Sequence, residues 1–300
     1  MKIEFINNVK IKPVITNQDG WNSKTVRGYD YYTNPYSNVC LLARKNSGKS
    51  TVIYRALEQC VAKGTNVFIF SPTVHMDATY KKMIAMLKKK KCNVIAKEHF
   101  IENGVDLIQE ILAVINNKED EEMDEKTELP TPPLLNFGDP RFQEVNRCSN
   151  GECTLVPRSI KKEKKVKKKS QRGKLITPES IFVFDDLSSV LRHKSISQLM
   201  TKNRHYKLKT FLACHSVNNL DKMALSCIDV FHVFANVSNE KIEELREKVN
   251  ITFKNDSKKK DSKLQQIYDM ATAGRYNFLY IDRINDCYRR NFNERILIEE

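Results

Sequence analysis

Short apolar runs alternate with segments of helical periodicity along much of the chain. The first run, NVCLL at residues 38–42, is wholly apolar, and residues 51–63 then carry apolar side chains at helical spacing up to Gly64. A second run, NVFIF at residues 66–70, precedes an amphipathic segment at about residues 80–87. The pattern therefore predicts a strand, a loop, a helix, a second strand and a second helix.

Four further apolar runs follow in the second half of the chain. They are SIFVF at 180–184, TFLAC at 210–214, DVFHVF at 229–234 and YNFLYI at 276–281, the last of which we interpret as an added edge strand. Strands that are apolar on both faces and alternate with helices indicate a parallel sheet with both faces covered. We therefore predict an α/β fold with a mostly parallel sheet flanked by helices.

The periodic pattern is interrupted once, and this divides the chain. We interpret residues 1–36 as an N-terminal extension and residues 37–300 as one domain, interrupted by an insertion at about 117–174. The insertion holds the acidic run EDEEMDE, the segment LPTPP and a long run of Lys and Arg that ends at Lys174. Like-charged blocks with Pro bury too little apolar surface to offset the entropy of ordering, so we expect the insertion to be disordered.

Charge and cysteine usage narrow the class of protein. The net charge of +14 favours a polyanionic partner, nucleic acid first. No apolar stretch is long enough to span a membrane and the N-terminus lacks the apolar segment of a secretory signal, so a soluble, intracellular protein is expected. We interpret the eight cysteines as reduced thiols, and the pair Cys148 and Cys153 lacks the two further ligands that a zinc site needs nearby.

The segment ARKNSGKS after the first strand fits the phosphate-loop pattern [AG]-x-x-x-x-G-K-[ST], with Ala instead of Gly at its first position. Backbone amides of such a loop and of the following helix point at a phosphate group. Lys49 would pair with β- and γ-phosphate oxygens of ATP, Ser50 would coordinate Mg²⁺, and Thr51 would contact the α-phosphate. The remaining members of the predicted site are Ala43, Arg44, Lys45, Asn46, Ser47 and Gly48. The alternative is a helix cap that merely carries a lysine.

A phosphate loop needs an acid at the end of a second strand, and SIFVFDD supplies two. We expect Asp185 to hold the Mg²⁺ shell through water, and Asp186 to orient or deprotonate the attacking water. A competing motif is NKED at residues 117–120, which fits the guanine-reading N-K-x-D of GTPases. It lacks the D-x-x-G that should precede it, and it also opens the acidic run of the insertion.

Together, four segments resemble the poxvirus-type genome-packaging ATPases of large DNA viruses, virophages and Polinton-like elements, a branch of the FtsK–HerA superfamily. The segments are LLARKNSGKS, FIFSPTVHMD, IFVFDDLSSV and QLMTKNRHYKLKTFLACHSVNNL. The resemblance spans residues 38–249 apart from the insertion. It implies a RecA-like P-loop ATPase core, ATP and Mg²⁺ as cofactors, and double-stranded DNA as a partner.

The resemblance also implies roles for two residues outside the two motifs. Arg204 looks like the family's conserved arginine, which implies an arginine finger that acts on a neighbouring subunit's ATP and hence a homo-oligomeric ring. The alternative is a surface arginine that ends a basic helix. His215 stands where the family generally has a polar sensor, often Gln, and a structural histidine is the alternative. Asp77 is expected to cap the helix that follows it.

These features predict an ATP-driven DNA translocase that packages a viral or virus-like genome, with capsid or portal components as further partners. Lysines at 81, 82 and 88–91 and the basic run of the insertion would contact the DNA backbone, or would be solvated faces. A helicase or DNA-transfer pump would share the same core, whereas a GTPase or small-molecule phosphotransferase would show no DNA stimulation. The run KKEKKVKKK also suits a nuclear import signal, so host cytoplasm, nucleus and virion all stay open.

Overall fold

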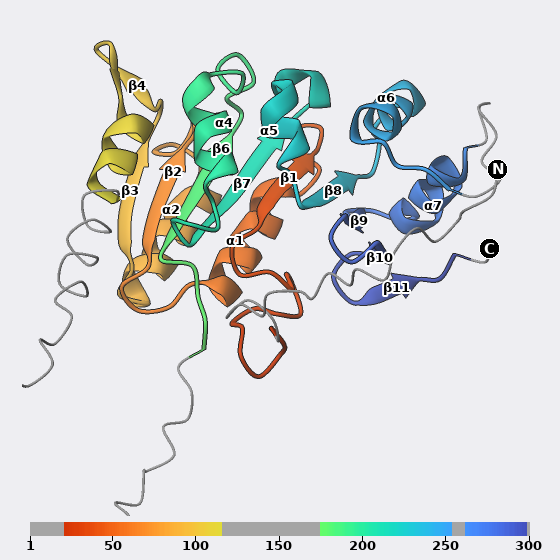
Figure 1. Cartoon of the computed structure of the whole chain (residues 1–300), viewed down its shortest axis with the longest axis horizontal. Coiled ribbons are helices and arrows are strands. Elements are labelled where there is room, and N and C mark those ends of the chain that lie inside the picture. Colours follow the sequence, from red (N-terminus) through yellow and green to blue (C-terminus); the bar gives the residue numbers. More distant parts are fainter. Residues whose placement is uncertain (1–20, 116–174, 254–261, 299–300) are drawn as a thin grey trace, which may run out of the picture. The chain divides into compact units, whose positions relative to one another are not determined.

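The computed structural model describes residues 21–115, 175–253 and 262–298 (Figure 1). The whole of the predicted insertion lies outside these ranges, with its NKED tetrapeptide, its cysteine pair and its charged runs. The strands and named helices belong to one compact unit made of residues 1–111 and 174–300. Of the second unit, residues 112–173, the described part is a helical segment at its start.

A nine-stranded sheet forms the centre of the first unit, in the order β11-β10-β9-β8-β1-β7-β6-β2-β3. The strands from β8 to β3 in this order are all parallel to their neighbours. They are β8 (Val230–Phe234), β1 (Asn38–Leu42), β7 (Leu208–Cys214), β6 (Ser180–Asp185), β2 (Asn66–Phe70) and β3 (Asn93–Lys97). Every residue of β1, β6, β7 and β8 is buried, which is why these strands are visible in the sequence as apolar runs. The predicted mostly parallel sheet is confirmed.

Helices cover both faces of the parallel strands (Figure 1). The helices α1 (Lys49–Cys60) and α2 (Ala78–Lys89) follow β1 and β2, and they share one apolar core with these strands. The helices α4 (Lys194–Thr201) and α5 (Lys222–Ser226) follow β6 and β7. From β6 to β8 the chain moves across the sheet in the direction opposite to that from β1 to β3. Right-handed crossovers in opposite directions place the two pairs of helices on opposite faces.

An antiparallel extension is attached to β8. It consists of β9 (Phe278–Asp282), β10 (Cys287–Arg290) and β11 (Glu294–Ile296), and it follows the helices α6 (Asn239–Val249) and α7 (Lys263–Thr272). The apolar run at 276–281 therefore forms β9, but two more strands lie between it and the edge of the sheet. A separate hairpin is made by β4 (Ile101–Glu102) and β5 (Val105–Asp106).

Part of the N-terminal segment is built into the core. Tyr32 is almost fully buried, with its ring against those of Phe211 and His232, and Val26 forms a β-bridge with Ile176. The described part of residues 1–36 therefore packs onto the sheet domain. Among the described residues, no helix has the length and apolar character needed to cross a membrane.

Candidate nucleotide-binding site

The candidate site lies at the carboxyl ends of β1, β7 and β6. The strands β1 and β7 are neighbours, yet the chain leaves β1 towards β2 and leaves β7 towards β8, on opposite sides of the pair. The crevice outside such a switch point is where open α/β sheets bind their ligands. The residues that follow these strands are the predicted phosphate loop, Asp186 and His215.

The phosphate loop has the backbone that an anion site requires. Asn46 and Gly48 have left-handed φ values of 62° and 96°, on either side of Ser47, and Ser47 Oγ donates a 2.8 Å hydrogen bond to the carbonyl of Arg44. Alternation of this kind turns successive amides towards one point. Ala43 has no left-handed backbone and is buried, so Ala fits where the motif often has Gly. Ala in place of Gly therefore causes no backbone strain at this position.

The first turn of α1 is open to an anion. The helix begins at Lys49, two residues earlier than the sequence pattern predicts, because Gly48 acts as its N-cap. No side chain caps this end and the first turn holds no acid. Its amides and the positive end of the helix dipole therefore remain available to a phosphate group.

Lys49 joins the phosphate loop to the two acids. Its ammonium lies 3.0 Å from Asp185 Oδ1 and forms a close ion pair with Asp186. Burial alone would lower the pKa of Lys49, but the two carboxylates outweigh burial and raise its pKa above the ordinary value. Lys49 is therefore held as a cation at the point where a phosphate chain would lie.

Ser50 and Asp185 lie side by side, as one shared ion requires. Ser50 Oγ is 3.5 Å from Asp185 Oδ2, and the same carboxylate oxygen accepts a hydrogen bond from the hydroxyl of Tyr80 in α2. Burial raises the pKa of Asp185, while Lys49 and Tyr80 act against that rise. The sequence pattern shows Tyr80 only as an apolar-face residue of α2, so this partner of Asp185 was not predicted.

The residues present fit a magnesium ion that arrives with a nucleotide. Oxygen donors from a hydroxyl and a carboxylate suit Mg²⁺, and Asp185 Oδ1 is buried without a partner in hydrogen-bond geometry although Lys49 lies nearby. In the described part of the chain, no group of three or more His, Cys, Asp or Glu side chains could hold a metal. If Mg²⁺ binds here, phosphate oxygens and water would supply the remaining ligands, as is usual for Mg²⁺ sites of this kind.

His215 connects the phosphate loop with Asp186. Its Nδ1 lies 2.7 Å from the carbonyl oxygen of Ala43, and its Nε2 lies 3.5 Å from Asp186 Oδ1. Asp186 itself has a left-handed φ of 56°, which turns its side chain out of the line of β6. Both side chains are more than two-fifths exposed, so they face the space above the loop.

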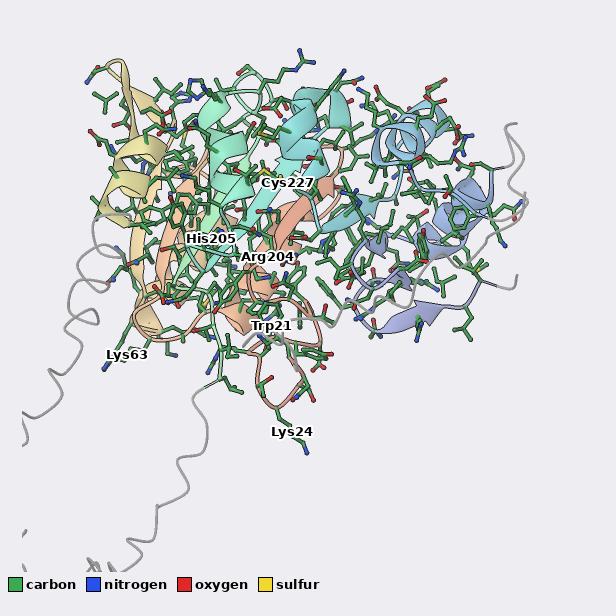
Figure 2. The ribbon with its side chains drawn as sticks, in the orientation of Figure 1. Trp21, Lys24, Lys63, Arg204, His205 and Cys227 are labelled. Carbon is green, nitrogen blue, oxygen red and sulfur yellow. The ribbon has the colours of Figure 1, made fainter. Side chains whose placement is uncertain are left out.

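Arg204 lies far from the phosphate loop of its own chain. It is exposed, in the turn between α4 and β7 (Figure 2), whereas His215 follows the other end of β7. Seven strand residues span roughly 23 Å, so the Arg204 side chain cannot reach the phosphate loop in cis. The predicted action of Arg204 on a neighbouring subunit's nucleotide stays a prediction.

The fold and the site together define a P-loop NTPase with a RecA-like core, in which one strand, β7, separates the strand of the phosphate loop from the strand of the acids. The family model of the poxvirus A32 protein matches residues 146–291, just under half of the chain. This match confirms the resemblance to the poxvirus-type genome-packaging ATPases. The matched stretch contains both acids, Arg204 and His215 but not the phosphate loop, which rests on its own geometry.

Several solved structures are similar to the chain, whereas no curated protein sequence matches it. The DNA-packaging ATPase B204 of Sulfolobus turreted icosahedral virus has 13% identity and a TM-score of 0.46, over 89% of this chain and 100% of that chain. The genome-packaging NTPase B204 of Sulfolobus turreted icosahedral virus 2, in complex with AMP, has 13% identity and a TM-score of 0.48, over 88% and 100%. The same protein with ATP-gammaS has 15% identity and a TM-score of 0.44, over 86% and 97%.

Proposed function

We propose that this protein is an ATP-hydrolysing DNA translocase that packages a viral or virus-like genome. The observation that carries the proposal is the convergence of Lys49, Ser50 and the Asp185–Asp186 pair at one end of the sheet. The family match supports this proposal, because it spans the acids and Arg204.

The first step that the residues support is an exchange of partners by Lys49. In the structure, the ammonium lies between Asp185 and Asp186. A bound triphosphate offers more negative charge at the same place, so Lys49 turns to the β- and γ-phosphate oxygens and releases Asp186. Binding of the substrate would thereby free the carboxylate that hydrolysis needs.

The freed Asp186 then orients the attacking water and accepts its proton, with His215 Nε2 beside it. Asp185 and Ser50 would hold Mg²⁺, which supplies neutralisation of charge on the phosphate oxygens when it is bound. Arg204 of a neighbouring subunit would complete the site, so the active form is a homo-oligomeric ring. Arginine fingers contribute about 10³ to 10⁵ in rate.

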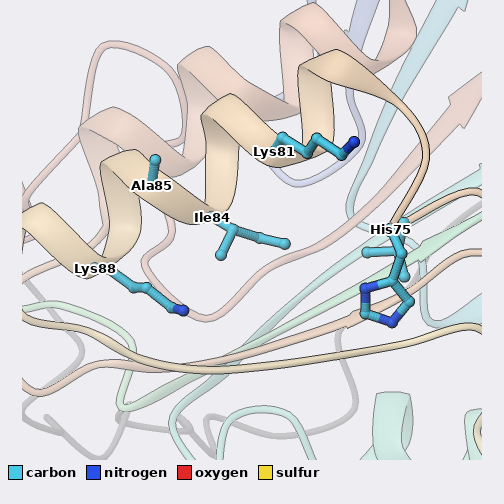
Figure 3. A pocket seen from close by; sticks show the side chains of 6 residues that line it. His75, Lys81, Ile84, Ala85 and Lys88 are labelled. Carbon is cyan, nitrogen blue, oxygen red and sulfur yellow. The ribbon is translucent and has the colours of Figure 1, made fainter.

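The surface of α2 supplies a candidate contact with DNA. A groove of about 410 Å³ is lined by Lys81, Lys88 and His75, with Ile84 and Ala85 between the two lysines (Figure 3). The α2 sequence holds four lysines and no acid, so all charged side chains of this helix are cationic. A motor must hold the phosphate backbone without reading the sequence, and lysines suit that contact. Lys90 is less available because it donates to the carbonyl of Glu58.

The test is ATP hydrolysis by the purified protein with and without double-stranded DNA. We expect DNA to accelerate hydrolysis of ATP several-fold, and the double variant Lys81→Glu/Lys88→Glu to lose this acceleration while it keeps basal activity. The matched control is Lys24→Glu/Lys63→Glu, which places the same charge change on two other exposed lysines (Figure 2). Hydrolysis that DNA leaves unchanged would refute a translocase and leave an ATPase of another kind.

A further inference from the structure

The loop between α7 and β9 lies against the phosphate loop. A methyl group placed on Gly48 would lie 3.4 Å from Cδ1 of Tyr276, so the tyrosine ring borders the N-terminus of α1 directly. More than 220 residues separate these two positions in the sequence. The antiparallel pairing of β8 with β9 explains the contact, because it brings the start of β9 to the sheet edge where β1 and β8 end.

The backbone of this loop is strained and is held in place. Tyr276 has a left-handed φ of 66°, and it is the one aromatic residue with such backbone among the residues that the structure describes. The carbonyl of Ala273 accepts hydrogen bonds from Asn277 Nδ2 at 2.6 Å and from Arg290 Nη2 at 2.9 Å. The amide of Ala235, just after β8, donates to the carbonyl of Asn277. Strain that is fixed by neighbours in this way is typical of functional positions.

The ring of Tyr276 is presented rather than buried. The residue is 53% exposed, and the guanidinium of Arg275 lies 4.7 Å from the ring centre. A large exposed aromatic side chain on a strained loop adds no packing to the apolar core. The arginine supports the ring and leaves aromatic surface open to a flat ligand.

The expected direction of a bound triphosphate places its nucleoside end on the side of the phosphate loop where Tyr276 lies. Asp185 and Asp186 follow β6, which lies on one side of β1, whereas β8 and β9 lie on the other side. The γ-phosphate end is drawn to Lys49 and the acids, so the chain of phosphates runs away from β6 across the phosphate loop. The nucleoside end must then emerge towards β8 and β9, where Tyr276 lies.

We propose that Tyr276, supported by Arg275, stacks on the aromatic base of the bound nucleoside triphosphate. This inference rests on the proposed nucleotide site and adds the part of it that holds the base. Stacking on an aromatic side chain tolerates any base, because every base has a flat π-face. Tyr276 therefore contributes affinity for the nucleoside part of ATP and nothing for the phosphates.

The test compares a ligand that has a base with one that lacks it. Binding of a non-hydrolysable ATP analogue and of inorganic tripolyphosphate, each with Mg²⁺, is measured for the wild-type chain, Tyr276→Asn and Tyr276→Phe. Asn removes the ring and suits left-handed backbone, whereas Phe keeps the ring. We expect Tyr276→Asn to bind the analogue on the order of tenfold more weakly and tripolyphosphate unchanged, and Tyr276→Phe to bind both as the wild type does.

Equal loss of both ligands, or no loss of the analogue, in Tyr276→Asn would overturn the proposal. A wild-type chain that binds neither ligand would instead refute the nucleotide site itself. A spectroscopic readout is available because the chain has a single Trp, at position 21. In the double variant Trp21→Phe/Tyr276→Trp, the ATP analogue should quench the fluorescence of the introduced indole and tripolyphosphate should not. Bound analogue without quenching would contradict stacking.

Discussion

His215 Nδ1 lies 2.7 Å from the carbonyl oxygen of Ala43, so the residue after β7 is hydrogen-bonded to the first residue of the phosphate loop. A carbonyl oxygen only accepts, which means that Nδ1 carries the proton in this contact. Nε2 is thereby directed towards Asp186, 3.5 Å away. One side chain therefore couples the position of the phosphate loop to the acid that is proposed to activate water.

His215→Ala should lower the turnover of ATP by about tenfold, in the lower range of what one positioned group contributes. His215→Gln should recover most of the loss, because its amide can still donate to the carbonyl of Ala43. The measurement is kcat at saturating ATP, with His205→Ala as the control on an exposed histidine of the turn before β7. Equal loss in the Ala and Gln variants would mean that the hydrogen bond to the loop does not matter.

Tyr80→Phe should weaken the binding of Mg²⁺ more than the binding of the nucleotide. The change removes the hydrogen bond that orients the Asp185 carboxylate, and loss of a partner of this kind typically costs 10- to 100-fold in metal affinity. The concentration of Mg²⁺ that gives half-maximal ATP hydrolysis should rise by about tenfold. At saturating Mg²⁺, the KM for ATP should change little.

The matched control for Tyr80→Phe is Tyr268→Phe. The Tyr268 hydroxyl is also hydrogen-bonded in the interior, to the carbonyl of Phe234, but it does not touch Asp185. Its removal should lower stability without moving the Mg²⁺ dependence. A similar Mg²⁺ shift in both variants would show that general loosening, and not the orientation of Asp185, causes the effect.

Arg204→Ala and Lys49→Ala should each be inactive alone and should regain activity when mixed. The length of β7, roughly 23 Å, separates Arg204 from the phosphate loop of its own subunit. A Lys49→Ala subunit cannot hydrolyse ATP but still has Arg204, so it can supply this arginine to an Arg204→Ala neighbour. The measurement is ATP hydrolysis by co-assembled variants across mixing ratios. Absence of any recovery, with assembly verified by light scattering, would argue against action in trans.

Lys209 makes part of the stability depend on pH. Its ammonium is buried above the ring of Tyr32, 4.4 Å from the ring centre, and donates to the carbonyl of Asn34 at 3.0 Å. Burial lowers the pKa of Lys209 to about 8. An unfolded lysine has a pKa of about 10.4, so between these values the unfolded chain binds more protons. This residue's contribution to the free energy of unfolding therefore rises with pH from about 8 to about 10.4, and it stays at its lowest value below 8.

The buried thiols of Cys40 and Cys60 act in the opposite direction. The hydrogen bond with Cys214 and burial raise the pKa of Cys40, and burial raises the pKa of Cys60 although nearby cations act against it. The informative quantity is therefore the difference in unfolding free energy between the wild type and Lys209→Met, measured by urea titration. From pH 8 to 9.5 this difference should move by about 1–2 kcal/mol in favour of the wild type. A difference that is constant across this range would mean that Lys209 is not held in a lowered-pKa environment.

The sequence predicted the parts of the fold whose strands are buried on both faces. The runs that became β1, β2, β6, β7 and β8 are apolar at nearly every position, so their pattern is unambiguous. The strand β3 was missed because it is only partly buried and follows a lysine-rich turn. The strand β10 was missed because it contains Arg289 and Arg290, although the Arg289 guanidinium lies over the ring of Tyr280.

The residues of the candidate site likewise divide into those that the sequence predicted and those that it did not. Lys49, Ser50 and Asp185 belong to local motifs whose spacing implies their chemistry, and the structure brings them together. Tyr80 and Tyr276 belong to no motif. Tyr80 reaches Asp185 across a separation of 105 residues, and only the pairing order of the strands decides that α2 and β6 meet. Apolar patterning identifies a side chain that faces the core, but not the atom that it meets there.

In the proposed mechanism, the phosphate loop holds a triphosphate through Lys49 and the neighbouring acids promote its hydrolysis. The most direct measurement is Mg²⁺-dependent ATP hydrolysis by the wild type and by Lys49→Ala, with Lys63→Ala as the control on an exposed lysine beyond the end of α1. We expect hydrolysis by the wild type and by Lys63→Ala, and none above background by Lys49→Ala. Full ATPase activity in Lys49→Ala would show that hydrolysis does not depend on this phosphate loop.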